Sequence, residues 1–181
     1  MSMQKLILFV AILLFIGCDE KISFIDIEEN INHLESLNSQ EREIAQMQIK
    51  HAKENNYRLI TTKELKDKLE SGGDLQIIAA IPRGIYILGF IKNAKNFEFS
   101  NNFSGIWEKD TKGSKDKFID FLGDRKKEII FYDNGENVAI TAAIWAKKLR
   151  YENVAILIGG FKGWKERDFE ISFDMPTCCQ I

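Results

Sequence analysis

The sequence predicts an α/β domain in three layers, with a central, mainly parallel sheet between two layers of helices. The first observation is that residues 75–81, 128–132 and 153–158 are short apolar runs rich in β-branched residues. Such runs are typical of parallel strands buried on both faces. The second is that helix-like segments separate these runs, as parallel strands require. The 181 residues, 45% of them hydrophobic, suffice for one such domain and a small extra segment.

Helices are expected between the strands, and one of them has a defined start. Thr61 and Glu64 form a capping-box pattern, in which two side chains satisfy free N–H groups at a helix N-terminus. Residues 89–99 are typical of a loop with a short strand. The expected helices are residues 61–71, 114–124 and 137–150, with a short helix or turn at residues 161–169.

Residues 18–57 precede the domain and read as a short helical stalk or tether. The segment after Cys18 is polar and contains no Gly or Pro. Asn38 and Glu41 form a second capping-box pattern, which predicts a helix from residue 39. A partly ordered tether is the alternative, because the helical face is narrow, and packing on the domain is left open. Three apolar residues before the helix from residue 39 fall at i, i+3 and i+6 on one helical face, so one or two short helices are expected in this segment: Ile31, Leu34 and Leu37.

Residues 1–17 have the layout of a signal peptide. One Lys precedes an apolar run, Leu6 to Ile16, that is shorter than the roughly 20 residues needed to cross a bilayer. The run ends in Phe15-Ile16-Gly17-Cys18, which resembles a bacterial lipobox. The resemblance implies a lipoprotein anchored through lipidated Cys18 on the periplasmic side of the cell envelope, in either membrane. An ordinary secretory signal or an uncleaved anchor remains the alternative.

Charge and cysteine content indicate which partners and which thiol chemistry to expect. The formal net charge is −2 and the basic residues are dispersed, so no nucleic-acid partner is expected. Cys178 and Cys179 are the remaining thiols; their Cα atoms are too close for an ordinary disulfide. They are candidate sulfur acceptors, a redox pair or soft-metal ligands, or else part of a frayed tail. No zinc-ligand spacing occurs, and neither a metal nor a cofactor is expected.

Five single residues can be assigned by type. His33 and His51 fall in the polar stalk and are expected to be solvated. Trp145 and Trp164 are expected in the core where helices meet the sheet, because Trp offers a large apolar area. Trp107 is also expected to pack, with a place at the mouth of a pocket as the alternative.

Four segments in this order resemble a rhodanese domain, the fold of sulfurtransferases. They read "ITTKEL", "GFIKNAKNFEF", "IIFYDNGENVAITAAIWAKKLRYENVAIL" and "GGFKGW". Each motif is weak alone, and their order makes the match specific. The resemblance covers residues 58–171 and implies a rhodanese-like three-layer domain there, followed by a C-terminal tail, residues 172–181.

The resemblance places the active-site loop directly after the strand at residues 128–132. In active family members this loop begins with a Cys that carries sulfur as a persulfide, stabilised by loop N–H groups and a helix N-terminus. Here the first loop position is Asp133, and its carboxylate cannot form a persulfide. Glu136 adds a second negative charge to the loop, and no Lys or Arg follows near its end. The resemblance therefore implies a degenerate site. The loop residues here are Asp133, Asn134, Gly135, Glu136, Asn137 and Val138.

Three interpretations of Asp133 are open. In the first, Asp133 is simply a residue that favours a turn between strand and helix, and Asp or Asn caps the next helix. Alternatively, its carboxylate occupies the loop N–H groups itself, which would lower its pKa because those bonds favour the charged form. The third interpretation is a catalytic carboxylate.

These features predict a membrane-anchored extracytoplasmic protein that is catalytically inactive at the loop and binds a protein or a small anion. One alternative is an active sulfurtransferase or sulfur carrier that uses Cys178 or Cys179. The other is a structural envelope lipoprotein. A binding role requires an open pocket or an exposed apolar patch near the loop.

Overall fold

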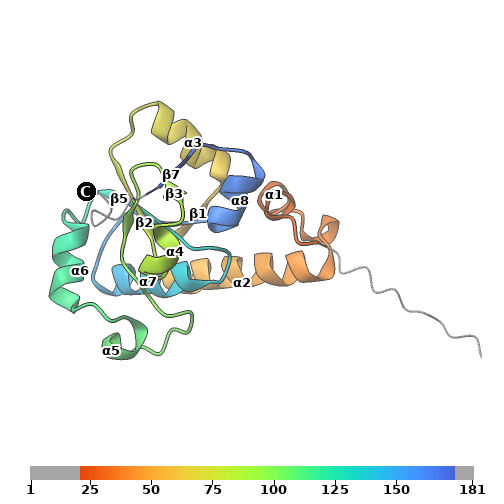
Figure 1. The fold of residues 1–181 in the computed structure, drawn as a ribbon. Coiled ribbons are helices and arrows are strands. Elements are labelled where there is room, and N and C mark those ends of the chain that lie inside the picture. The colour runs from red at the N-terminus through yellow and green to blue at the C-terminus, as the bar shows by residue number, and fades with distance from the viewer. Residues whose placement is uncertain (1–20, 174–181) are drawn as a thin grey trace, which may run out of the picture.

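The computed structural model describes residues 21–173 and is built around one five-stranded sheet (Figure 1). All neighbouring strands in this sheet are parallel. The apolar runs form its three longest strands, as predicted. The strand order is β1 (Arg58–Ile60), β6 (Val154–Leu157), β5 (Glu128–Tyr132), β2 (Leu75–Ala79) and β4 (Lys95–Asn96).

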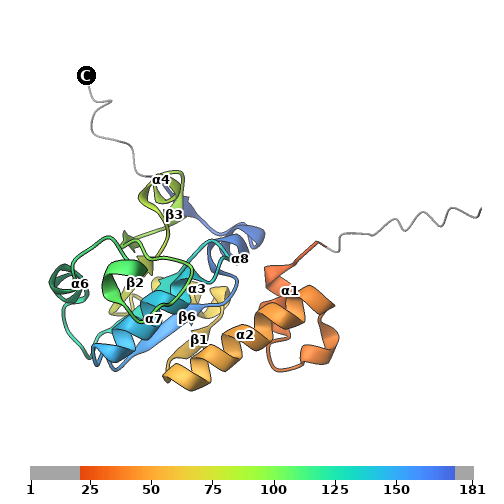
Figure 2. The same cartoon turned by 90° about the horizontal axis from the view of Figure 1, so that it is seen from below.

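Helices cover both faces of the sheet, which confirms the three-layer α/β fold (Figures 1 and 2). One face carries α3 (Thr62–Glu70) and α8 (Gly160–Glu166). The other face carries α7 (Val138–Lys148), α6 (Lys115–Leu122) and the short α5 (Trp107–Asp110). The short α4 (Arg83–Tyr86) follows β2, and β3 (Phe90–Ile91) pairs antiparallel with β7 (Ile171–Ser172).

Alternate residues of the central strands enter two separate cores. Ile129 and Phe131 of β5 pack with the α7 side, whereas Ile130 and Tyr132 pack with the α3 and α8 side. This two-sided burial explains why the strands are continuously apolar. Full burial of one such side chain contributes about 1.5–3 kcal/mol. The three tryptophans also lie in these cores, as expected: Trp107, Trp145 and Trp164.

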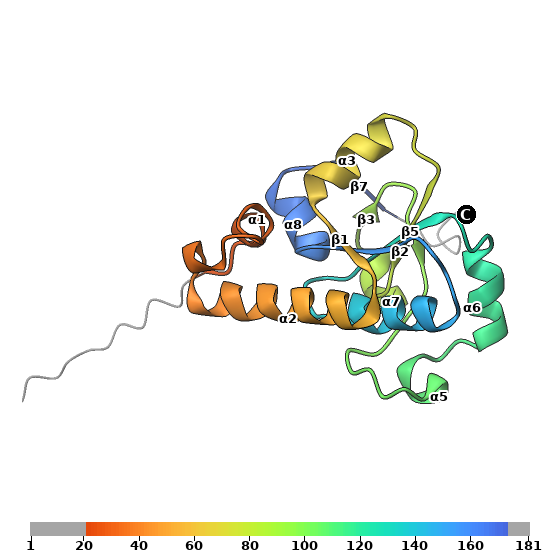
Figure 3. The same ribbon diagram turned by 180° about the vertical axis from the view of Figure 1, so that it is seen from behind.

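The segment expected to be a helical stalk or tether packs on the domain, a point that the sequence left open (Figure 3). Helix α1 (Phe24–Glu29) contacts α8, and α2 (Ser39–Asn55) contacts α7 and β1. The capping box at the start of α2 is confirmed. The N–H of Glu41 donates to the side chain of Asn38 (2.9 Å), and the N–H of Asn38 donates to the Glu41 carboxylate (3.2 Å).

Two α-helices form in this segment, but the helical face expected through Ile31, Leu34 and Leu37 was wrong, because these residues lie between α1 and α2. The chain turns after α1 and forms only a 3-10 helix, η1 (Leu34–Ser36). The guanidinium of Arg42 donates to the carbonyl oxygens of Leu34 (2.9 Å) and Leu37 (2.9 Å). These bonds from α2 hold an irregular backbone, and the i, i+3 spacing alone gives no sign of them.

Candidate functional site

The loop between β5 and α7 is closed by its own first residue. The Oδ1 atom of Asp133 accepts hydrogen bonds from the N–H groups of Gly135 (2.7 Å) and Glu136 (3.2 Å). Its Oδ2 atom accepts one from the N–H of Ala139, in the first turn of α7 (2.9 Å). The carboxylate therefore occupies converging loop N–H groups and the helix N-terminus, where the resemblance would place a sulfur anion.

The same carboxylate caps α7. The residue at the N-cap position, Asn137, has a left-handed backbone (φ 64°), and its side chain makes no capping bond. Asn tolerates this conformation better than most residues. Asp133 supplies the missing acceptor from outside the helix through Ala139. Capping and occupation of the loop, which the sequence left as separate interpretations, are thus one arrangement.

The expectation of a lowered pKa for Asp133 was wrong. Burial raises the pKa of Asp133, although the N–H groups of Ala139, Gly135 and Glu136 favour the charged form. The negative charge of the Glu136 side chain raises the pKa further. Only 6% of Asp133 is exposed, so the loss of water outweighs three neutral donors.

A pair of glycines after β6 allows the loop to close. The N–H of Phe161 donates to the carbonyl oxygen of Asp133 (2.7 Å). Gly160 has a positive φ of 54°, and a Cβ at this position would collide with that carbonyl oxygen. The Gly-Gly motif therefore serves the close approach of two adjacent strand ends.

Helix α1 covers the outside of the loop. The Phe24 ring lies so close to Gly135 that a Cβ added there would be 2.9 Å from the ring. Phe24 also packs against Gly159 and Gly163, and only 6% of it is exposed. Lys162 of helix α8 lies beside this ring, with its Nζ atom 5.7 Å from the ring centre. No sequence pattern indicates that Phe24 or Lys162 lies at the site.

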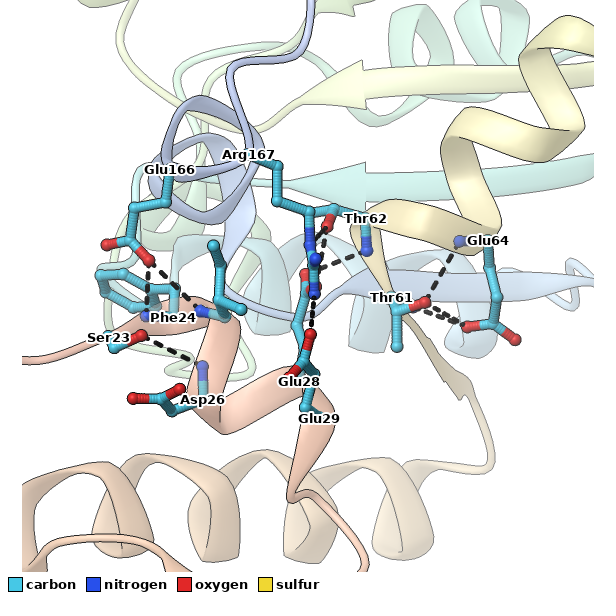
Figure 4. Close-up of polar contacts among 11 residues, drawn as sticks. Ser23, Phe24, Asp26, Glu28, Glu29, Thr61, Thr62, Glu64, Glu166 and Arg167 are labelled. Atoms are coloured by element: carbon cyan, nitrogen blue, oxygen red, sulfur yellow. Dashed lines mark hydrogen bonds and ion pairs between the residues drawn. The ribbon is translucent and has the colours of Figure 1, made fainter.

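Polar contacts to α3 and α8 fix α1 in this position (Figure 4). The carboxylate of Glu166 accepts from the N–H of Phe24 (2.8 Å), 142 residues away along the chain. Glu28 is buried and accepts from the N–H (2.9 Å) and hydroxyl (2.7 Å) of Thr62. Arg167 donates to both Glu28 (3.3 Å) and Thr62 (3.0 Å). Burial nonetheless raises the pKa of Glu28.

A cavity of about 590 Å³ opens beside the loop, between α2, α7 and residues 101–103. This volume is in the usual range for a ligand pocket. Glu136 and Asn137 of the loop form part of its wall, and Ile140 and Ile144 of α7 form part of its apolar lining. His51, expected to be only solvated, also lines it and is partly buried.

A second buried carboxylate, Asp110, holds the wall that carries Phe103. Asp110 accepts hydrogen bonds from the hydroxyl (2.6 Å) and N–H (2.8 Å) of Ser104 and from the N–H of Gly105 (3.2 Å). The indole of Trp145 on α7 donates to it as well (2.9 Å). Burial opposes ionisation of Asp110, but these bonds outweigh it and lower its pKa. Sequence inspection missed this residue because its partners lie in a loop and on a distant helix.

Cys18, Cys178 and Cys179 lie outside the described residues. Within residues 21–173, no group of three or more His, Cys, Asp or Glu side chains could hold a metal ion. No helix in this range is long and apolar enough to cross a membrane.

Comparison with known proteins identifies the family. The model of the rhodanese-like domain matches residues 61–167. This is more than half of the 181 residues, and the chain belongs to the rhodanese-like domain family. The search of curated proteins returned no match.

Solved structures agree with this fold. The BH2092 protein from Bacillus halodurans matches with a TM-score of 0.54 and 18% identity, over 69% of this chain and 83% of that one. The rhodanese-like domain of the Alr3790 protein from Anabaena sp. gives 0.52 and 18%, over 68% and 84%. The thiosulfate sulfurtransferase from Pseudomonas aeruginosa gives 0.51 and 15%, over 68% and 22%.

Proposed function

We propose that this chain is a non-catalytic member of its family that is anchored through lipidated Cys18 outside the cytoplasm and binds a partner protein. The observation that carries the proposal is the Asp133 carboxylate inside the loop. It stands where the resemblance requires a thiol, and it already accepts the N–H groups that would stabilise a persulfide. A carboxylate has no sulfur to form that bond.

The surroundings of the loop also oppose sulfur chemistry with an anionic donor. Glu136 is exposed at the loop and repels anions. Phe24 covers Gly135, and the Lys162 ammonium lies over that ring rather than inside the loop. Binding of a small anion in the loop would require displacement of Asp133, so a protein partner is the better supported ligand.

A binding role is favoured over a purely structural one by the cavity beside the loop. Its apolar lining and polar wall are typical of a recognition site. The sulfur-carrier alternative depends on Cys178 and Cys179, and the experiment below includes both.

The test is a sulfurtransferase assay on the full chain. We expect no thiocyanate from thiosulfate and cyanide, and no cyanide-removable mass increase after thiosulfate or polysulfide treatment. Cys178→Ser/Cys179→Ser is the matched control for the tail. Turnover that this double variant abolishes would replace the proposal with the sulfur-carrier function. Turnover that persists in it would locate catalysis elsewhere and also overturn the proposal.

Anchoring is tested separately by expression in a bacterium that processes lipoproteins. We expect the wild-type chain in the membrane fraction, with a mass that corresponds to diacylated Cys18. Cys18→Ala should lose the lipid mass, whereas the Cys178→Ser/Cys179→Ser control should keep it. An unmodified wild-type chain with residues 1–17 still present would contradict this part of the proposal.

A further inference from the structure

The cavity beside the loop has an apolar lining that includes two acidic side chains. Met47 of α2 and Ile140 and Ile144 of α7 contribute its aliphatic surface, together with Phe103 from the opposite wall. Phe103 is 37% exposed, so this wall remains accessible to solvent. An apolar pocket of this kind accepts an aliphatic stem or chain.

All carboxylates in the lining belong to two glutamates on different elements. Glu54 comes from the last turn of α2, and Glu136 from the loop after β5. No Lys or Arg is among the residues that form the cavity. Glu54 has a Lys50 ammonium 4.0 Å away, but Lys50 is not part of the lining and its side chain is 70% exposed. Glu136 has no ion pair among the described residues.

The other polar groups suit a hydrogen-bond donor. Asparagine side chains supply amide oxygens from three elements. His51 lies 4.0 Å from Glu54 and adds no fixed charge when neutral. The nearby ammonium of Lys148 lies 5.7 Å from the centre of the Phe103 ring, so that ring already has a cation partner. Recognition of a ligand's charge therefore falls to the two carboxylates. The asparagines are Asn55, Asn101, Asn102 and Asn137.

We propose that this cavity binds an arginine side chain presented by the partner protein. An aliphatic stem with a cationic, planar, donor-only tip complements the apolar lining, the two carboxylates and the amide oxygens together. The assignment rests on the proposed function, because it names the chemistry by which the partner is recognised. It also makes Glu136 of the former active-site loop a binding residue.

The test uses two peptides that differ only in charge. Acetyl-Gly-Leu-Arg-Leu-Gly-amide is titrated into the full, isotope-labelled chain in detergent, and the same peptide with citrulline in place of arginine is the control. Citrulline keeps the length and shape of arginine without its charge. Calorimetry gives the affinity, and amide chemical shifts locate the site. We expect saturable binding of the arginine peptide, with shifts at Met47, Phe103 and Asn137, and about tenfold weaker binding of the citrulline peptide.

Variants of the protein assign the charge recognition. Glu54→Gln and Glu136→Gln are each expected to weaken arginine-peptide binding about threefold, and the double variant about tenfold, because charge pairs at partly exposed sites are modest. Glu43→Gln, an exposed position on the same helix α2, should bind as the wild type does. Raised salt should weaken the arginine peptide and leave the citrulline peptide unchanged.

Several results would overturn the proposal. These are equal affinity for both peptides, unchanged binding in the double variant, shifts away from the cavity, or no saturable binding of the arginine peptide. If Glu136→Gln does not fold, the two-peptide comparison on the wild type and on Glu54→Gln still decides. Sulfur transfer is measured independently, so loss of the proposed function and loss of this inference are distinguishable.

Discussion

Asp133 in the loop after β5 and Asp110 at the end of α5 are both buried aspartates that organise an irregular segment. Asp133 accepts hydrogen bonds only from backbone N–H groups, and its pKa is raised. Asp110 also accepts from the Ser104 hydroxyl and the Trp145 indole, and its pKa is lowered. Glu136 adds a repelling charge at the first site.

The difference shows that converging backbone N–H groups do not by themselves favour a buried carboxylate. In this loop the N–H groups hold Asp133 in place, but their hydrogen bonds do not offset the cost of desolvating its charged form. At Asp110 desolvation is smaller, and hydrogen bonds from Ser104, Trp145 and Gly105 outweigh it. The loop is thus an arrangement suited to an anion, occupied by a side chain that is only partly suited to it.

The largest expected effect is from truncation of either aspartate. Asp110→Ala leaves two backbone N–H groups, a hydroxyl and an indole N–H without their acceptor, and should lower the free energy of unfolding by about 4 kcal/mol. Asp133→Ala orphans three N–H groups and should cost about 3 kcal/mol. Urea denaturation measures both. Asp67→Ala, an exposed position on α3, is the control and should change stability by less than about 0.5 kcal/mol.

Phe24→Ala tests whether α1 contributes to the loop. Loss of a buried ring should cost about 3 kcal/mol, and amide hydrogen exchange at Gly135 and Glu136 should accelerate because their cover is removed. Phe173→Ala, where the side chain is 64% exposed, should change neither quantity. Unchanged exchange in the loop of the Phe24 variant would show that α1 packs there without protecting it.

The two aspartates should give pH dependences of opposite sign. The folded state holds the Asp133 proton more tightly than the unfolded state, so the stability from this group falls as pH rises above about 3.9 through the folded pKa. The contribution of Asp110 is present above about 3.9 and is lost as pH falls through its lowered pKa.

Urea denaturation between pH 3 and 7 checks this with Asp133→Asn and Asp110→Asn. The stability of the wild type relative to Asp133→Asn should fall with rising pH, and relative to Asp110→Asn it should increase. Either slope is limited to about 1.4 kcal/mol per pH unit for one group. Slopes of the same sign would contradict the contrast between the two sites.

The smallest effect is expected from Asp133→Cys in the Cys178→Ser/Cys179→Ser background. A thiol alone should not give thiocyanate formation, because Glu136 still repels an anionic donor and Phe24 still covers Gly135. Thiocyanate formation by Asp133→Ala in the same background is the control. Turnover above that of the Asp133→Ala variant would mean that a thiol at this single position is sufficient for activity.

Local patterns predicted the elements that depend on neighbours in the sequence. The capping boxes at Asn38 and Thr61 form with both reciprocal bonds. The three-residue strand β1 was missed because so short a segment of mixed exposure shows no hydrophobic periodicity. Strand β1 forms because it pairs with β6, which is distant in the sequence. A short strand was expected within residues 89–99, where the structure has both β3 and β4, but the two-residue strand β7 that pairs with β3 was missed for the same reason.

The sequence by itself determined the α/β fold, the position of the loop and the presence of a carboxylate at its start. These follow from apolar runs, capping residues and motif order, all of which are local in the chain. Only the tertiary structure decided that α1 covers the loop, that a cavity opens beside it, and that the pKa of Asp133 is raised. Each of these depends on burial by segments distant in sequence, and desolvation is set by everything that surrounds a group in space.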